Sequence, residues 1–254
     1  MGADVYFPYI PAGESRRGAY TALLADRGVY DFQPLKISSR FPLGLLRTMQ
    51  RLDKPQRVLV ANVGGEAIAR LVSEGVQAKW SLVPEFIAPV MEAVGVRCGY
   101  TLPAKLGVDR WLGVIAAFHR LRGDACVVNV GTAMTIDGVD AHGQHLGGVI
   151  VPGPDLAVAS LLHNTSDIAT HAQSGEVRDA LFADNTLGAI HQGTAHMLAA
   201  LIEKSVITMR ERVGKTPSLI LSGGASHRVA PLVTTDFETV PDLVLQGLAV
   251  LARG

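Results

Sequence analysis

Three apolar runs with short connections follow one another near the middle of the chain. They cover Ala125–Val130, Thr135–Val139 and Leu146–Val151, and the connections between them are too short to hold a helix. Strands joined by such tight turns pair antiparallel with their neighbours. Pro152-Gly153-Pro154 ends the third run, and a helical pattern from Asp155 to Leu162 follows. The segment is therefore a three-stranded antiparallel sheet followed by a helix.

Helical patterns flank this sheet on both sides in the sequence. Their bounds, with one more strand, are Arg110–Leu121, Asn185–Arg212, Leu219–Leu221 (strand) and Asp242–Ala252. Asn185 is a suitable N-cap for the long second helix. This order indicates a mixed α/β sheet covered on both faces, as in a ribonuclease-H-like lobe. The apolar stripes of the first two helices fit a buried core face or a contact between two copies of the chain.

The first part of the chain is harder to interpret. Arg57–Asn62 has the pattern of a short buried strand, and Glu66–Ser73 that of a following helix. Residues 1–56 carry several prolines and glycines and predict no element. The polar segment His163–Glu176 is expected to be a loop.

Composition narrows the class of ligand and the compartment. The 254 residues include 23 Lys plus Arg and 23 Asp plus Glu, so the formal net charge is zero and predicts no binding to nucleic acid. We find no apolar run of membrane-spanning length and no targeting pattern at the N-terminus. Two cysteines make neither a disulfide framework nor a zinc site. We expect a cytoplasmic protein that binds a small metabolite and no membrane.

One candidate catalytic residue lies at the start of the first flanking helix. Asp109 belongs to the sequence Gly107-Val108-Asp109-Arg110. Glycine permits a close approach of substrate, and the carboxylate can accept a proton from a hydroxyl group. Alternatively, Asp109 is an acidic residue favoured at a helix N-terminus by the helix dipole.

Three glycine-containing segments are candidates for a nucleotide site. Asn129–Thr135 is a turn with hydroxyl groups that could bind phosphate through backbone N–H groups. Leu146–Gly153 and Ser222–Ala225 contain paired glycines, which allow a nucleotide to approach the backbone. Each segment alone is equally well explained as a hairpin turn or as a packing requirement.

The order of these segments resembles that of type III pantothenate kinases, from about Gly99 to Gly247. The shared pattern is Gly-x-Asp-Arg, Gly-Thr-Ala-x-Thr, Gly-Gly-x-Ile-x-Pro-Gly, Asn-Thr at 185–186 and Gly-Gly-Ala at 223–225. The resemblance implies an actin-like ATPase fold of class α/β, with two ribonuclease-H-like lobes and a cleft between them. The lobes would comprise residues 1–104 and 105–254. It also implies ATP-dependent phosphorylation of pantothenate, the first step of coenzyme A biosynthesis.

The resemblance also assigns roles to individual residues. Asp109 would be the catalytic base. The implied substrate-binding residues are Tyr100, Gly107, Val108, Asp109, Arg110 and Thr186. The implied ATP-binding residues are Gly131, Thr132, Thr135, Gly223 and Gly224, and Asn129 would bind a monovalent cation. Mg²⁺ and K⁺ or NH₄⁺ are the implied ions, and a homodimer is the implied assembly.

Two features depart from the family pattern. Residues 1–56 lack the Asp-x-Gly-Asn-Thr or Asp-x-Gly-Asn-Ser turn that binds the ATP phosphates in the family. Asn129 replaces an aspartate that many members carry, so the side chain offers an oxygen ligand without a charge. An alternative function is therefore a catalytically impaired relative that acts as a pantothenate-binding or regulatory accessory protein.

Overall fold

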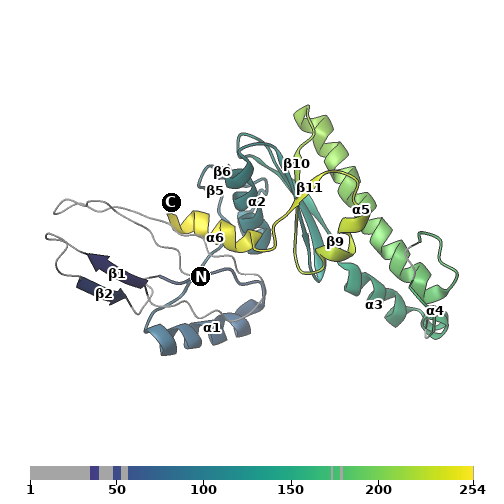
Figure 1. Ribbon diagram of the computed structural model, residues 1–254, viewed down its shortest axis with the longest axis horizontal. Coiled ribbons are helices and arrows are strands. Elements are labelled where there is room, and N and C mark those ends of the chain that lie inside the picture. Colours follow the sequence, from purple (N-terminus) through teal and green to yellow (C-terminus); the bar gives the residue numbers. More distant parts are fainter. Residues whose placement is uncertain (1–34, 40–47, 53–56, 173, 178–179, 254) are drawn as a thin grey trace.

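The computed structural model describes residues 35–39, 48–52, 57–172, 174–177 and 180–253. Figure 1 shows a central sheet with helices on both sides. Residues 1–56, whose sequence lacks the phosphate-binding turn of the family, are mostly outside the described residues. Within the described residues, no helix is long and apolar enough to cross a membrane.

A five-stranded sheet forms the centre of the C-terminal part. Its strand order is β11-β10-β7-β8-β9. Strands β7, β8 and β9 form an antiparallel meander, whereas β10 pairs parallel to β7 and β11 pairs parallel to β10. The bounds are Ala125–Val130 (β7), Ala133–Val139 (β8), His145–Pro152 (β9), Ser218–Ser222 (β10) and Phe237–Thr239 (β11). The expected α/β fold class and the ribonuclease-H-like strand order are confirmed.

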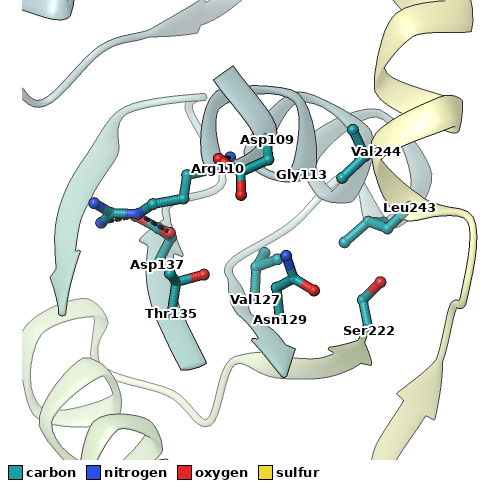
Figure 2. A pocket seen from close by; sticks show the side chains of 10 residues that line it. All are labelled: Asp109, Arg110, Gly113, Val127, Asn129, Thr135, Asp137, Ser222, Leu243 and Val244. Atoms are coloured by element: carbon teal, nitrogen blue, oxygen red, sulfur yellow. Dashed lines mark hydrogen bonds and ion pairs between the residues drawn. The ribbon is translucent and has the colours of Figure 1, made fainter. Parts of the chain in front are cut away.

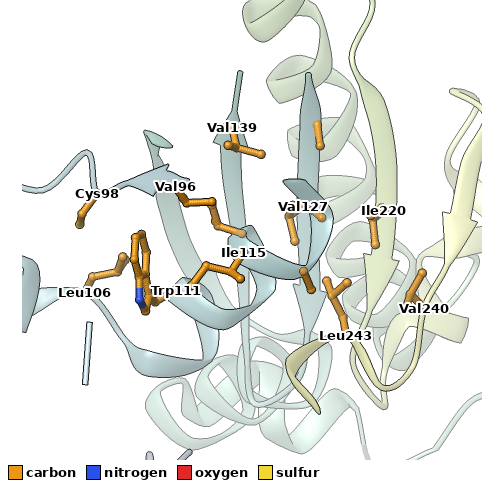
Figure 3. Close-up of a cluster of buried hydrophobic side chains, with 14 residues drawn as sticks. Val96, Cys98, Leu106, Trp111, Ile115, Val127, Val139, Ile220, Val240 and Leu243 are labelled. Carbon is orange, nitrogen blue, oxygen red and sulfur yellow. The ribbon is translucent and has the colours of Figure 1, made fainter. Parts of the chain in front are cut away.

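Helices cover the two faces of this sheet, and alternation along the strands divides the core between them. Helices α2 (Val108–Leu121) and α6 (Leu243–Arg253) cover one face. Ala125, Val127 and Ile220 point to that side, where they pack with Trp111 and its neighbours (Figure 3). The alternate strand residues pack against α5 (Thr186–Val213) on the other face. The apolar stripe of α2 therefore belongs to the core and is not a contact between two copies.

The remaining elements lie outside the five-stranded sheet and its three covering helices. They are β1 (Leu35–Ser39), β2 (Thr48–Leu52), β3 (Leu59–Val60), α1 (Gly65–Trp80), β4 (Glu85–Phe86), β5 (Glu92–Ala93), β6 (Val96–Arg97), η1 (Pro103–Lys105), α3 (Pro154–Asn164), α4 (Ser166–His171), η2 (Ser226–Arg228) and η3 (Ala230–Leu232). The expectation of a loop over His163–Glu176 was wrong, because it contains the short helix α4. A helix of six residues has too few positions to show a helical period.

Glu203 of α5 ties this helix to the segment that leads into β11. Its carboxylate accepts hydrogen bonds from the backbone N–H groups of Thr234 (2.6 Å) and Thr235 (2.9 Å), and from both threonine hydroxyls. Burial alone would raise the pKa of Glu203, but the hydrogen bonds from Thr235 and Thr234 outweigh it and lower the pKa to about 2. The ionised carboxylate therefore stabilises the folded state.

We expect Glu203→Gln to lower the free energy of unfolding at pH 7 by about 1–3 kcal/mol, because it removes hydrogen bonds to a charged acceptor. The folded-state pKa, about 2, lies below the ordinary value of 4.5. The contribution is thus complete above about pH 4.5 and is lost as the pH falls from there towards 2. Urea unfolding at pH 7 and pH 3 measures it, with Glu211→Gln on the same helix as control. Equal pH dependence in Glu203→Gln and the unsubstituted protein would contradict the assignment.

Candidate active site

Polar side chains gather where the strands end on the face covered by α2. Alternation continues the inward row of β7 from Ala125 and Val127 to Asn129, and that of β10 from Ile220 to Ser222. Thr135 and Asp137 occupy the same face of β8. The apolar core on this side thus gives way to four polar side chains from three neighbouring strands, as Figure 2 shows.

These four residues line a pocket closed by two helices. Asp109 and Arg110 from the first turn of α2 complete its polar side. The apolar side consists of Gly113, Val127, Leu243 and Val244 (Figure 2). Of the residues expected in the site, Asp109, Arg110, Asn129 and Thr135 are therefore brought together in one pocket.

Asp109 carries the carboxylate that faces this pocket from α2. Gly107 is the N-cap of the helix and has extended backbone geometry, and Val108 is buried beside it. Asp109 Oδ1 accepts a hydrogen bond from the backbone N–H of Arg110 at 2.9 Å. Among the residues that the structure describes, no basic side chain forms an ion pair with Asp109. Its carboxylate thus remains available to accept a proton.

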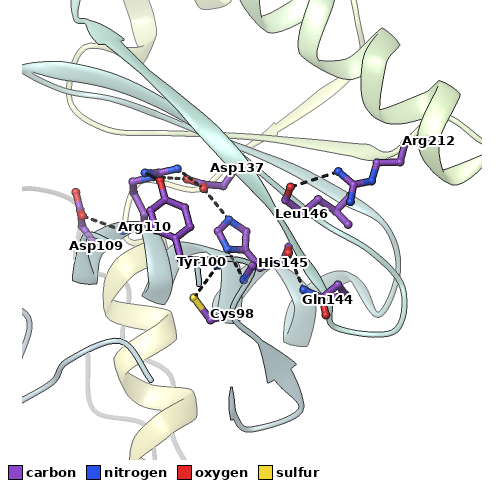
Figure 4. Close-up of polar contacts among 10 residues, drawn as sticks. Cys98, Tyr100, Asp109, Arg110, Asp137, Gln144, His145, Leu146 and Arg212 are labelled. Atoms are coloured by element: carbon purple, nitrogen blue, oxygen red, sulfur yellow. Dashed lines mark hydrogen bonds and ion pairs between the residues drawn. The ribbon is translucent and has the colours of Figure 1, made fainter. Parts of the chain in front are cut away.

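The side chain of Arg110 turns away from Asp109 and pairs with Asp137. Its Nε donates to Asp137 Oδ2 at 2.8 Å, and its Nη2 donates to Oδ1 at 2.6 Å. Its Nη1 donates to the hydroxyl of Tyr100 at 2.9 Å (Figure 4). Burial lowers the pKa of Arg110, but the bonds and the charge of Asp137 raise it more, so the pKa lies above its ordinary value. Arg110 and Asp137 neutralise one another, so Asp109 is the carboxylate of the pocket that has no basic partner among the described residues.

Asp137 and His145 were not predicted as site residues, and Ser222 was included only as the first residue of the candidate nucleotide segment Ser222–Ala225. His145 contacts Asp137 from β9, at 2.9 Å between Nε2 and Oδ1. One signal was present for Asp137: a charged residue within a run read as a buried strand, two positions from Thr135. Nothing comparable distinguished His145 or Ser222, since both lie at strand ends where polar residues are common.

The expected nucleotide segments also meet at one end of the sheet. Gly131 and Thr132 form the turn between β7 and β8, and the N–H of Gly153 donates to Thr132 O at 2.8 Å. A Cβ atom on Gly153 would lie 2.0 Å from Gly131 O, and one on Gly223 would lie 2.3 Å from Val130 O. Glycine is thus required at 153 and 223 for the three segments to approach one another.

Two of the predicted nucleotide contacts are at the surface of this glycine-lined region. The side chain of Thr132 is exposed at the tip of the turn, and Gly224 is exposed with no atom within 4 Å of a Cβ placed there. Gly223 has a positive φ of 91°, a backbone conformation that favours glycine. The paired glycines therefore have separate uses: Gly223 packs against β7, and Gly224 leaves open space.

Thr186 is placed apart from the other predicted substrate residues. It opens α5, where the Asn185 side chain accepts a hydrogen bond from the N–H of Gly188 at 2.8 Å and caps the helix. This end of α5 packs beside α3 and α4, whereas α2 covers the opposite face of the sheet (Figure 1). A single chain does not bring Thr186 to Asp109.

Oxygen atoms dominate the groups that could hold a cation. The described residues contain no group of three His, Cys, Asp or Glu side chains placed to bind a metal ion. The pocket instead offers the Asn129 amide and the Thr135 and Ser222 hydroxyls beside the Asp109 carboxylate. Such oxygens suit hard cations such as K⁺ or Mg²⁺, particularly if a bound phosphate supplies further ligands.

Known proteins match most of this chain. A family model described as "Type III pantothenate kinase" matches residues 39–208. The type III pantothenate kinase of Nitrosococcus oceani is 36% identical over 224 residues, which cover 85% of this chain and 84% of that protein. That of a Polaromonas species is 36% identical over 206 residues, 79% of each chain. The fold resembles the crystal structure of a Baf family protein from Campylobacter jejuni, with a TM-score of 0.51, 23% identity and coverage of 82% and 89%.

Proposed function

The chain belongs to the type III pantothenate kinase family, and from this premise we propose that Asp109 is the base of its reaction. The enzyme transfers a phosphoryl group from ATP to pantothenate, the step that begins coenzyme A biosynthesis. The carboxylate of Asp109 accepts the proton of the primary hydroxyl of pantothenate. The hydroxyl oxygen forms a bond to the γ-phosphorus at the same time. The bond from the γ-phosphorus to the bridging oxygen breaks, and ADP leaves.

The observation that carries this role is the pocket with a free carboxylate on one side and an apolar wall on the other. Pantothenate carries its primary hydroxyl next to a carbon with two methyl groups. Of the apolar residues that line the pocket, Val244 is partly exposed and could contact such methyl groups, whereas Gly113 and Leu243 are buried; Asp109 would face the hydroxyl. Tyr100, Gly107, Val108 and Arg110 are the further substrate residues of this proposal.

ATP is assigned to the glycine-lined end of the sheet. The turn of Gly131 and Thr132 would contact the phosphates, with Thr135 below it and Gly223-Gly224 near the adenosine. Mg²⁺ supplies charge neutralisation on the phosphates when it is bound. Asn129 would bind K⁺ or NH₄⁺ through its amide oxygen, which fits a monovalent ion because no full charge is needed.

A homodimer would explain the position of Thr186. Because Thr186 and Asp109 lie on different sides of one chain, a second copy is needed if both are to contact the same pantothenate molecule. Hydrophobic side chains are exposed on the edge strand β9 and on the nearby helices, among them Val149, Ile150, Leu156 and Met197. An apolar surface of this kind suits association of two identical chains.

The test is turnover by the purified protein with ATP, Mg²⁺ and pantothenate. We expect ADP release that depends on pantothenate and a product whose mass corresponds to 4′-phosphopantothenate. We place this activity in the cytoplasm, where ATP is available. Calorimetry that detects pantothenate binding in a protein without turnover would instead support the accessory role.

A further inference from the structure

His145 is a buried histidine that has no role in the proposed function. Its side chain is fully buried at the first residue of β9. Both ring nitrogens have partners: the backbone N–H of Gly99 lies 3.3 Å from Nδ1, and Asp137 Oδ1 lies 2.9 Å from Nε2. The ring also stacks on Tyr100, with 6.1 Å between centroids and 13° between planes (Figure 4).

These contacts assign the tautomer of His145. A backbone N–H can only donate, so Nδ1 accepts the bond from Gly99 and carries no proton. The ring proton is then on Nε2, from which it is donated to Asp137.

Asp137 transmits this contact to the substrate residues. Its Oδ1 accepts hydrogen bonds from both His145 Nε2 and Arg110 Nη2, and its Oδ2 accepts one from Arg110 Nε. The carboxylate is thereby held in the plane of the guanidinium fork, which fixes the direction in which Arg110 Nη1 meets the hydroxyl of Tyr100. Without the His145 bond, Asp137 Oδ1 keeps only the bond from Arg110 Nη2, so the orientation of the carboxylate and the fork is less restrained.

Two glycines pack closely against this network of side chains. A Cβ atom on Gly148 would lie 2.4 Å from Asp137 Oδ1 and 2.6 Å from Arg110 Nη2. A Cβ atom on Gly99 would lie 2.3 Å from the backbone oxygen of His145. Gly99 and Gly148 therefore border the space that is filled by the side chains of Tyr100, Arg110, Asp137 and His145.

We propose that His145 is a positioning residue for pantothenate, acting through Asp137 and Arg110 on Tyr100. The inference rests on the proposed function, because Tyr100 and Arg110 are substrate residues only if that function holds. It adds that binding of pantothenate depends on a histidine that never touches it, whereas binding of ATP does not.

Two substitutions separate the bonds that His145 makes. In His145→Gln, the amide nitrogen lies close to the position of Nε2 and can still donate to Asp137. In His145→Asn, the shorter amide lies near Nδ1 and keeps only the contact with Gly99. A hydrogen bond to a charged group contributes about 1.5–3 kcal/mol, so its loss predicts a KM for pantothenate raised about tenfold or more in His145→Asn. We expect His145→Gln to stay within about threefold of the unsubstituted enzyme.

Steady-state kinetics against each substrate in turn make the test. The KM for ATP should remain within about twofold in both variants, since the network lies on the pantothenate side. If His145 only stabilised the fold, its substitution would lower the fraction of active enzyme and would not raise the KM for pantothenate selectively. In that case His145→Gln would not restore the behaviour of the unsubstituted enzyme. If His145→Asn does not fold, His145→Phe, which fills the space without either bond, replaces it with the same expected division between KM values.

The outcomes of this test are distinct from those for the proposed function. An active enzyme whose KM for pantothenate is unchanged in His145→Asn overturns the positioning role and leaves the kinase assignment intact. Absence of pantothenate-dependent turnover in the unsubstituted protein contradicts the kinase function itself.

Discussion

Replacing Asp109 by asparagine should lower kcat for pantothenate phosphorylation by about 10²–10⁴-fold, the usual contribution of a general base. The amide keeps the shape of the side chain and its acceptance of the Arg110 N–H, but it cannot take up a proton. The KM for ATP should change little, because the proposed ATP contacts are made by other residues. Steady-state ADP release measures the effect.

A matched control exists in α1. Glu66 is the second residue of that helix, as Asp109 is of α2, and both helices begin after a glycine N-cap without a side-chain hydrogen bond. Glu66→Gln removes the same kind of charge from a helix N-terminus far from the pocket. Each variant should lose at most about 1 kcal/mol of stability through the helix dipole, but only Asp109→Asn should lose activity. Unchanged turnover in Asp109→Asn would remove the proposed base.

Much of the C-terminal fold could be predicted because its elements are strongly patterned. The run Ala125–Val130 is apolar on both faces, and this is what a strand covered by helices on both sides requires. The stripe of Trp111 and Ile115 predicted α2, although the sequence alone left open whether it was a core face. By contrast, β11 (Phe237–Thr239) was missed, because an exposed edge strand of three residues has no apolar run.

The site was predicted only where a residue type itself suggests chemistry. Asp109 beside glycine has a plausible role in any fold, whereas His145 acquires one only from partners at residues 99 and 137. The pairing register of β8 and β9 sets Asp137 opposite Gly148, and this position leaves space for the guanidinium of Arg110. The packing of Arg110, Asp137 and Gly148 depends on contacts between residues that are far apart in the sequence, and a local sequence pattern does not reveal such contacts.

Asp137→Asn should have the largest effect on stability, about 3–5 kcal/mol, because it leaves Arg110 buried without its counter-ion. Both side chains are only 3% exposed, and the new amide NH₂ group would face the donors of Arg110 and His145. In the unsubstituted protein burial lowers the pKa of Arg110 and Asp137 raises it, and the substitution removes the contribution of Asp137 while the burial remains. The KM for pantothenate should rise as well, since the fork no longer fixes Tyr100.

The ion pair between Arg120 and Glu238 provides the matched control for this change. It also pairs an arginine of α2 with a carboxylate, here on β11, but its side chains are 40% and 44% exposed. Glu238→Gln makes the same carboxylate-to-amide substitution, and solvent screening limits its cost to about 1 kcal/mol or less. Urea unfolding of both variants measures the difference. Equal losses of stability would mean that burial does not set the strength of the Arg110–Asp137 pair.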